Sequence, residues 1–191
     1  MMKFISYLLF CAPVIRDITL RSTSMVQGGA HGFYNAGNYK MALKLALVGL
    51  EKTKGMESKN DQWQWWEFMK LAIDTGIKLN NESDYEAVKQ YALTDYSPSS
   101  REVAKYYLRL SMLGFNFNDK AIVDLAEMAL KADESWGEPE FMLGWYMLKE
   151  NIDAAISHFK KAIEKDASYK ERIREDEVCN RYPQVAEIIG G

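Results

Sequence analysis

Residues 37–52 read GNYKMALKLALVGLEK, a glycine turn followed by apolar residues that recur every three or four positions. This spacing predicts a helix with one apolar stripe. The end of the stretch, beginning at Gly49, has counterparts beginning at Ala92, Ala129 and Ala162, at intervals of 43, 37 and 33 residues. These intervals lie around or above the roughly 34-residue period of helix-turn-helix repeats, in which each helix pair buries its apolar face against the next. An up-and-down bundle has no reason to repeat in this way, so the sequence favours stacked helix pairs.

The same apolar spacing continues along the rest of the chain, whereas strict alternation, the sign of a strand, is scarce. The sequence therefore predicts an all-α fold, an α-α superhelix of about four antiparallel helix pairs with a closing helix. One repeat domain, residues 24–191, would follow a leading segment, residues 1–23. The expected helices are 24–36, 38–53, 61–79, 83–96, 100–114, 118–132, 138–149, 151–165 and 169–181, with a short tail near 184–189.

Helix start signals fall at four places where a serine precedes an acidic residue by three positions. Such a serine can accept a hydrogen bond from a free backbone N–H of the first turn, while the acid bonds back to the N–H of the serine. We therefore expect helices to begin near Ser58, Ser83, Ser99 and Ser168.

Glycine, aromatic and small residues recur at fixed spacing in two of the predicted pairs. They are residues 37–42, Ala46, Gly49 and Leu50 in the first pair, and Leu143, Gly144, Tyr146, Ala155, Phe159 and Ala162 in the last. This pattern resembles the tetratricopeptide repeat, and the last pair is also similar to the related Sel1-like repeat. The resemblance implies a helical repeat protein whose first helices line a concave, protein-binding surface.

The resemblance also implies which residues of each first helix pack and which line the groove. Small residues at packing positions let helix backbones approach closely. The implied packing positions are Val26, Gly29, Ala30, Phe33, Met69, Ala72, Ile73, Gly76, Tyr106, Leu110, Leu113, Met142, Leu143 and Tyr146. The implied partner-binding residues between them are Gln27, His31, Tyr34, Asn35, Lys70, Asp74, Tyr107, Ser111, Glu140 and Met147. This mixed polar and aromatic set would suit a protein segment or a globular partner.

The densest aromatic stretch is residues 63–69, WQWWEFM, whose side chains would point around most of the circumference of a helix. Two interpretations stay open. In the first, Trp66 and Met69 pack inward while Trp63 and Trp65 cover the adjacent pair or the N-terminal segment. In the second, some of these side chains, Trp65 among them, anchor a partner, because tryptophan is enriched at the energetic centres of interfaces.

Composition and charge argue against several classes of function. The 24 Lys and Arg residues against 27 Asp and Glu give a net charge of −3, so no basic field is available to bind nucleic acid. Cys11 and Cys179 are too few for a disulfide framework and lack the spacing of a zinc site. Only His31 and His158 could act as near-neutral acid–base groups, and neither has a nucleophile constellation around it in the sequence. The sequence therefore predicts no catalytic residues, no cofactor and no metal.

An apolar run, residues 4–15, follows Lys3 and has the size of the apolar core of a signal peptide, although it is too short to span a bilayer. Charged residues follow it at once, and only Ser22–Ser24 offers a weak cleavage pattern. We therefore favour a leading segment packed against the body of a cytoplasmic protein. The alternative is a periplasmic or secreted protein, if residues 1–24 act as a signal peptide. No integral membrane span is expected elsewhere.

Stacked helix pairs form a surface that offers many contacts to a partner and needs no reactive group. The sequence therefore predicts a non-catalytic protein–protein interaction module that binds a partner protein or peptide in its concave groove. An alternative is an immunity-type inhibitor that neutralises one cognate toxin or enzyme. An enzyme of unrecognised class is a minor alternative, because no catalytic set is recognisable.

Overall fold

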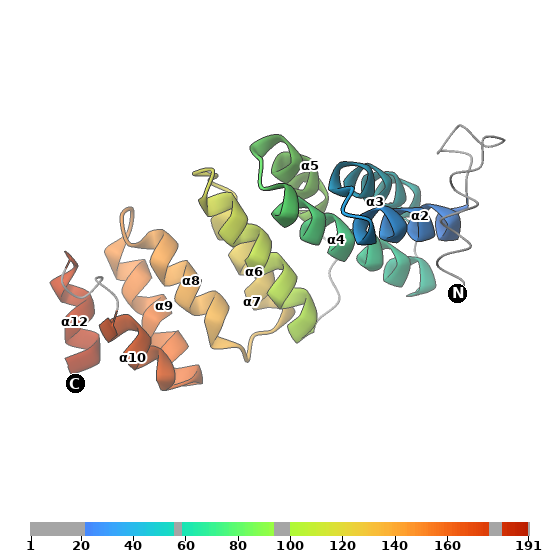
Figure 1. Ribbon diagram of the computed structural model, residues 1–191. Coiled ribbons are helices and arrows are strands. Elements are labelled where there is room, and N and C mark those ends of the chain that lie inside the picture. Colours follow the sequence, from blue (N-terminus) through green and yellow to red (C-terminus); the bar gives the residue numbers. More distant parts are fainter. Residues whose placement is uncertain (1–21, 56–58, 94–99, 176–180, 191) are drawn as a thin grey trace. The chain divides into compact units, whose positions relative to one another are not determined.

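The computed structural model describes residues 22–55, 59–93, 100–175 and 181–190. Within these ranges the chain forms helices joined by turns and contains no strand. Neighbouring helices pack in pairs (Figure 1), which confirms the predicted all-α fold of paired helices. The chain divides into two compact units, Met1–Asp95 and Tyr96–Gly191, and the predicted repeat domain spans both of them.

The first unit contains four described helices. A first pair is formed by α2 (Thr23–Asn35) and α3 (Tyr39–Thr53). Gly37 lies in the turn between them with φ of 75°, a left-handed conformation that glycine adopts without strain. The next helix, α4 (Lys59–Leu79), packs against α3, and α5 (Glu82–Ala92) packs against α4.

The second unit contains two further helix pairs and a terminal extension. In each pair the two helices pack against each other, and the second helix of the first pair also packs against the first helix of the next. Both helices of the extension pack against the last paired helix. The elements are α6 (Arg101–Phe115), α7 (Ile122–Ala132), α8 (Gly137–Met147), α9 (Ile152–Lys165), α10 (Ser168–Glu175) and α12 (Pro183–Gly190).

The observed helix ends lie within four residues of the predicted ends, except for α10, which is described to Glu175, six residues before the predicted end at 181. The largest difference at a start is in α7, which begins at Ile122 instead of residue 118. Asn118 has φ of 55°, and the side chain of Asp119 accepts a hydrogen bond of 3.2 Å from the backbone N–H of Ala121. These two features form a turn that delays the helix, because a left-handed residue cannot belong to a right-handed helix.

Asparagine begins three of the second helices in their pairs. Asn38, Asn81 and Asn151 are the N-cap residues of α3, α5 and α9. Each side-chain oxygen accepts a hydrogen bond of 3.0–3.2 Å from the backbone N–H three residues later. The predicted cap at Ser83 is therefore wrong, because Asn81 takes that role two residues earlier. The predicted start signals at Ser58 and Ser99 lie outside the described residues, and the neighbouring Ser100 caps α6.

Two turns of the second unit are built alike. Asp133 follows α7 and Asp166 follows α9, and each carboxylate accepts a hydrogen bond from the backbone N–H of the serine two residues later. These bonds measure 3.0 Å to Ser135 and 2.8 Å to Ser168. The pKa of Asp133 is lowered mainly by the hydrogen bond from the side chain of Arg101 and next by Ser135, and the pKa of Asp166 is lowered mainly by the backbone N–H of Ser168. The two turns are 33 residues apart, which is the interval that the sequence predicts for the last repeat.

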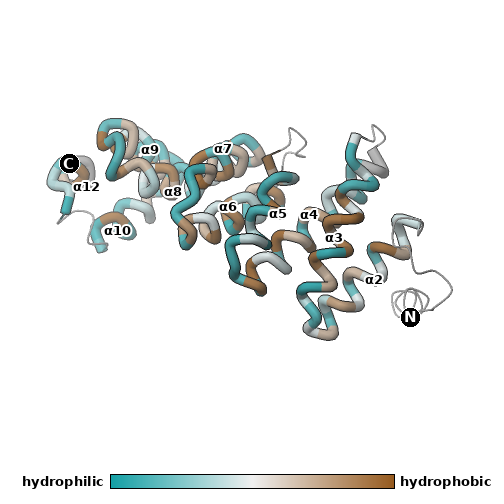
Figure 2. Tube along the Cα trace, turned by 90° about the horizontal axis from the view of Figure 1, so that it is seen from above, coloured by the Kyte–Doolittle hydropathy of each residue, from teal (hydrophilic) through white to brown (hydrophobic). Residues whose placement is uncertain are grey.

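Most of the predicted packing positions are buried. Fully buried side chains among them and in the last repeat are Val26, Ala30, Met69, Ala72, Ile73, Leu110, Leu143, Ala155, Phe159 and Ala162. Figure 2 shows that apolar and polar residues alternate along the helices of each unit. In α6 the predicted packing positions Leu110 and Leu113 are buried, but Tyr107 is fully buried and the predicted Tyr106 is only partly buried.

Gly144 provides a test of the close packing between α8 and α9. A Cβ atom built at this position would lie 2.7 Å from Cδ1 of Phe159, which is too close for two carbon atoms. We expect Gly144→Ala to lower the free energy of unfolding by about 1–3 kcal/mol through overpacking. Urea denaturation followed by circular dichroism measures this change.

Gly76 of α4 is the matched control. A Cβ atom there would meet only Cγ2 of Val88, at the ordinary contact distance of 3.5 Å. Gly76→Ala should therefore be neutral or stabilising by about 0.5–1 kcal/mol, because alanine is the better helix former. Equal stability losses in the two variants would contradict the packing described for Gly144.

Candidate functional site

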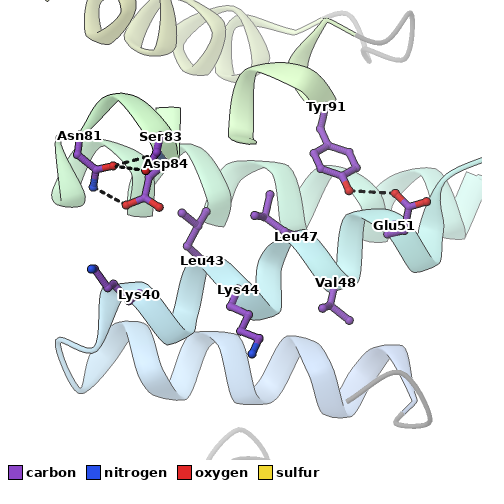
Figure 3. A pocket seen from close by; sticks show the side chains of 10 residues that line it. All are labelled: Lys40, Leu43, Lys44, Leu47, Val48, Glu51, Asn81, Ser83, Asp84 and Tyr91. Carbon is purple, nitrogen blue, oxygen red and sulfur yellow. Dashed lines mark hydrogen bonds between the residues drawn. The ribbon is translucent and has the colours of Figure 1, made fainter. Parts of the chain in front are cut away.

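The first unit contains a groove of about 900 Å³ between α3 and α5 (Figure 3). Both helices are the second members of their pairs. We call this feature the α3–α5 groove. It is lined by Lys40, Leu43, Lys44, Leu47, Val48 and Glu51 from α3, and by Asn81, Ser83, Asp84 and Tyr91 from α5 and its N-cap.

The six α3 residues of the groove recur at three- and four-residue spacing, so they share one face of the helix. Other positions of α3, including Leu45 and Leu50, are fully buried because α2 and α4 pack against this helix. On the groove face Leu43 is buried, whereas Leu47 and Val48 are partly exposed. The helix is therefore apolar on its packed side and also along part of the groove.

A polar network forms the wall of the groove at the start of α5. The side-chain oxygen of Asn81 accepts hydrogen bonds of 3.0 Å from the hydroxyl of Ser83 and the backbone N–H of Asp84. The amide nitrogen of Asn81 also donates to the carboxylate of Asp84. Figure 3 shows these three side chains gathered at one end of the groove. The N-cap of α5 thus holds the carboxylate of Asp84 in place.

The opposite end of the groove is closed by a hydrogen bond between the two helices. The hydroxyl of Tyr91 on α5 donates to Oε2 of Glu51 on α3 at 2.9 Å (Figure 3). Burial of the phenol raises the pKa of Tyr91, and the hydrogen bond to the Glu51 carboxylate raises it further. Tyr91 therefore stays protonated at neutral pH and remains a donor to Glu51.

The groove has two lysines on α3, one turn apart. Lys40 and Lys44 are exposed, and neither forms an ion pair with another residue that the structure describes. The two acids of the groove, Asp84 and Glu51, already accept hydrogen bonds from its walls. The arrangement thus combines an apolar strip with a cationic edge. It can hold a chain segment by apolar contact and by ion pairing.

None of the eleven residues predicted to bind a partner lines the α3–α5 groove. The structure places them on the first helices of the pairs, as the sequence predicted, with seven in the first unit and four in the second. They are Gln27, His31, Tyr34 and Asn35 on α2, Trp65, Lys70 and Asp74 on α4, Tyr107 and Ser111 on α6, and Glu140 and Met147 on α8.

Four of these eleven residues are buried, which corrects the accessibility that the sequence predicted for them. Tyr107 and Ser111 are fully buried, and Glu140 and Trp65 retain 4% and 5% of their surface. A side chain without exposed surface cannot contact a partner while the unit keeps this fold. The exposed tryptophan of α4 is Trp63, which is 58% accessible.

The buried polar residues have internal partners that explain their burial. The hydroxyl groups of Ser111 and Tyr146 share a hydrogen bond of 2.8 Å that joins α6 to α8. Glu140 on α8 lies 2.6 Å from Nδ1 of His158 on α9 and accepts a hydrogen bond of 3.3 Å from Nζ of Lys165. A buried carboxylate needs such partners, so Glu140 links two helices.

The sequence interpretation missed the groove because it placed the binding surface on the first helices. One signal was present in residues 41–50, where Lys44 is the only charged residue. A helix with one buried stripe needs fewer apolar residues than this segment has. The surplus, Leu47 and Val48, lies in the groove.

No protein-family model matches the chain, and no curated protein matches it. The resemblance to tetratricopeptide and Sel1-like repeats therefore stays a prediction. Among the residues that the structure describes, no group of three or more His, Cys, Asp or Glu side chains is placed to hold a metal ion. None of the described helices combines the length and the apolar character needed to cross a bilayer.

Proposed function

We propose that the chain is a non-catalytic interaction module that binds a segment of a partner protein in the α3–α5 groove. The observation that carries this proposal is the partly exposed apolar strip of Leu47 and Val48 inside a groove with charged edges. Interfaces of this kind have an apolar centre that excludes water and a polar rim that sets orientation.

The dimensions of the groove favour a chain segment as the ligand. Lys40 and Glu51 lie eleven residues apart on α3, which corresponds to about 16 Å along a helix. This length accommodates about three helical turns, or about five residues of an extended strand at roughly 3.3 Å each. The walls are also fixed before binding, because α3 packs against α2 and α4 and the Tyr91–Glu51 bond joins the two sides. A preformed site reduces the ordering cost of association.

This proposal moves the binding surface from the first helices to the second helices. It keeps the mode of action that the sequence predicted, recognition of another protein by shape and polarity. Two roles are compatible with it, a scaffold that holds several partners and an immunity-type inhibitor that blocks one toxin or enzyme. Capture of partners from the native host separates them, because an inhibitor should retain one cognate protein.

Leu47→Asp should strongly weaken this capture. A carboxylate placed against the apolar part of a bound segment would be desolvated without a partner, so we expect affinity to fall at least about tenfold. The fold should persist, because Leu47 is partly exposed and makes the groove wall rather than the packed side of α3. Captured proteins are identified by mass spectrometry, and circular dichroism checks helical content.

Met112→Asp on α6 is the matched control. Met112 is an apolar helical residue that is 50% exposed and lies outside the groove. The proposal requires that this variant capture the same proteins as the wild type. Retention of every partner by Leu47→Asp would show that the groove is not the binding site.

A further inference from the structure

We infer that the bound segment carries an acidic side chain beside its apolar anchor, and that Lys40 and Lys44 bind this acid while Leu47 and Val48 contact the anchor. The inference rests on the proposed function, since it specifies the chemistry of the partner for the same groove. The occupant is therefore a peptide segment that carries one acidic side chain and one large apolar side chain.

The position of the charges supports an acidic ligand. Lys40 and Lys44 are one turn apart on the groove face of α3, so their side chains can reach the same carboxylate or two neighbouring ones. Asp84 and Glu51 already accept hydrogen bonds from Asn81 and Tyr91 within the walls. These bonds leave both carboxylates charged, but at the beginning of α3 two lysines face the single carboxylate of Asp84, so the formal charge at this end is +1.

The apolar strip distinguishes a peptide from a nucleic acid. A phosphate backbone would satisfy the two lysines but would place no apolar side chain on Leu47 and Val48. The chain as a whole also carries a net charge of −3, which opposes a polyanion at longer range. A peptide with one or two acids and an apolar neighbour satisfies both parts of the groove.

The spacing on α3 sets the spacing in the ligand. Lys44 precedes Leu47 and Val48 by three and four residues, which is about 5 Å along the helix axis. The acid and the apolar anchor of the partner should therefore be three or four residues apart in a helical segment, or about two apart in an extended one. Glu51 at the far end disfavours a second acid there.

Selection from a random peptide library tests the inference. Peptides of about twelve residues, long enough to cover the groove as a helix, are displayed on phage and selected on the full chain. We expect enrichment of Asp or Glu within four residues of a large apolar side chain. Synthetic peptides from the selection should bind Lys40→Glu/Lys44→Glu at least about tenfold more weakly than the wild type.

A second charge reversal provides the control. Lys160→Glu/Lys161→Glu changes two exposed lysines of α9 and alters the net charge by the same amount. The selected peptides should bind this variant as they bind the wild type. Equal weakening by both double variants would overturn the inference, because the attraction would then come from net charge and not from the groove.

The remaining outcomes separate the inference from the proposed function. Peptides that lose binding with Leu47→Asp but show no acidic preference would refute the acidic partner and leave the groove as a binding site. A failure to select any peptide that depends on Leu47 would refute both. Single-stranded DNA that binds through Lys40 and Lys44 would also overturn the inference.

Discussion

Removal of both side-chain partners of Glu140, in the double variant His158→Phe/Lys165→Met, will lower the free energy of unfolding by about 3–5 kcal/mol. The side chain of Glu140 is only 5% exposed, and its two carboxylate oxygens contact His158 and Lys165. Without these partners the carboxylate would be buried with no compensating charge, which is costly in a medium of low polarity. Urea denaturation monitored by circular dichroism measures the loss.

Two further variants show whether the loss comes from the unpaired carboxylate. Adding Glu140→Leu to the double variant removes the buried charge, so most of the lost stability should return. Arg174→Ala breaks the ion pair with Glu171, in which both side chains are more than half exposed, and should cost less than about 1 kcal/mol. A triple variant as unstable as the double variant would show that packing, and not charge, dominates at this position.

The fold could be predicted because periodicity and repetition are properties of the sequence itself. The three- and four-residue spacing of apolar residues located the described helices, and the interval of 33 residues reappears in the turns at Asp133 and Asp166. The caps were harder to assign. Ser83 and Asn81 lie two residues apart, and both residue types cap helices well, so local sequence does not decide between them.

The choice between the two tyrosines of α6 illustrates a second limit of sequence reasoning. Tyr106 and Tyr107 are adjacent and identical, so a periodic pattern that tolerates either one cannot say which faces inward. Tertiary packing makes the choice, and it buries Tyr107. Ser111, one turn later, is buried with it and bonds to Tyr146.

The α3–α5 groove could not be predicted from the sequence for a different physical reason. A groove exists where two packed helices leave space between their side chains, and this space depends on how each helix packs on α4. The pattern of Leu47 and Val48 shows that α3 has surplus apolar surface, but it does not show what covers that surface. Only the structure shows α5 beside it, with Tyr91 bonded to Glu51.

Tyr107→Ala will destabilise the protein by about 3–5 kcal/mol, the range for truncating a large aromatic side chain in a core. Tyr107 is fully buried, and it is among the largest side chains with no exposed surface in the described residues. Truncation to alanine leaves a cavity and removes most of the contacts that the ring makes. Urea denaturation should show a lower midpoint for this variant.

Tyr106→Ala is the control, because it changes the same residue type at the next position of the same helix. Tyr106 is partly exposed and its ring lies 5.3 Å from the guanidinium of Arg109, a contact worth about 0.5–1 kcal/mol at an exposed site. We therefore expect a loss of about 1 kcal/mol, well below that of Tyr107→Ala. The reverse order of the two losses would restore the assignment that the sequence predicted, with Tyr106 in the core and Tyr107 on the partner-binding surface.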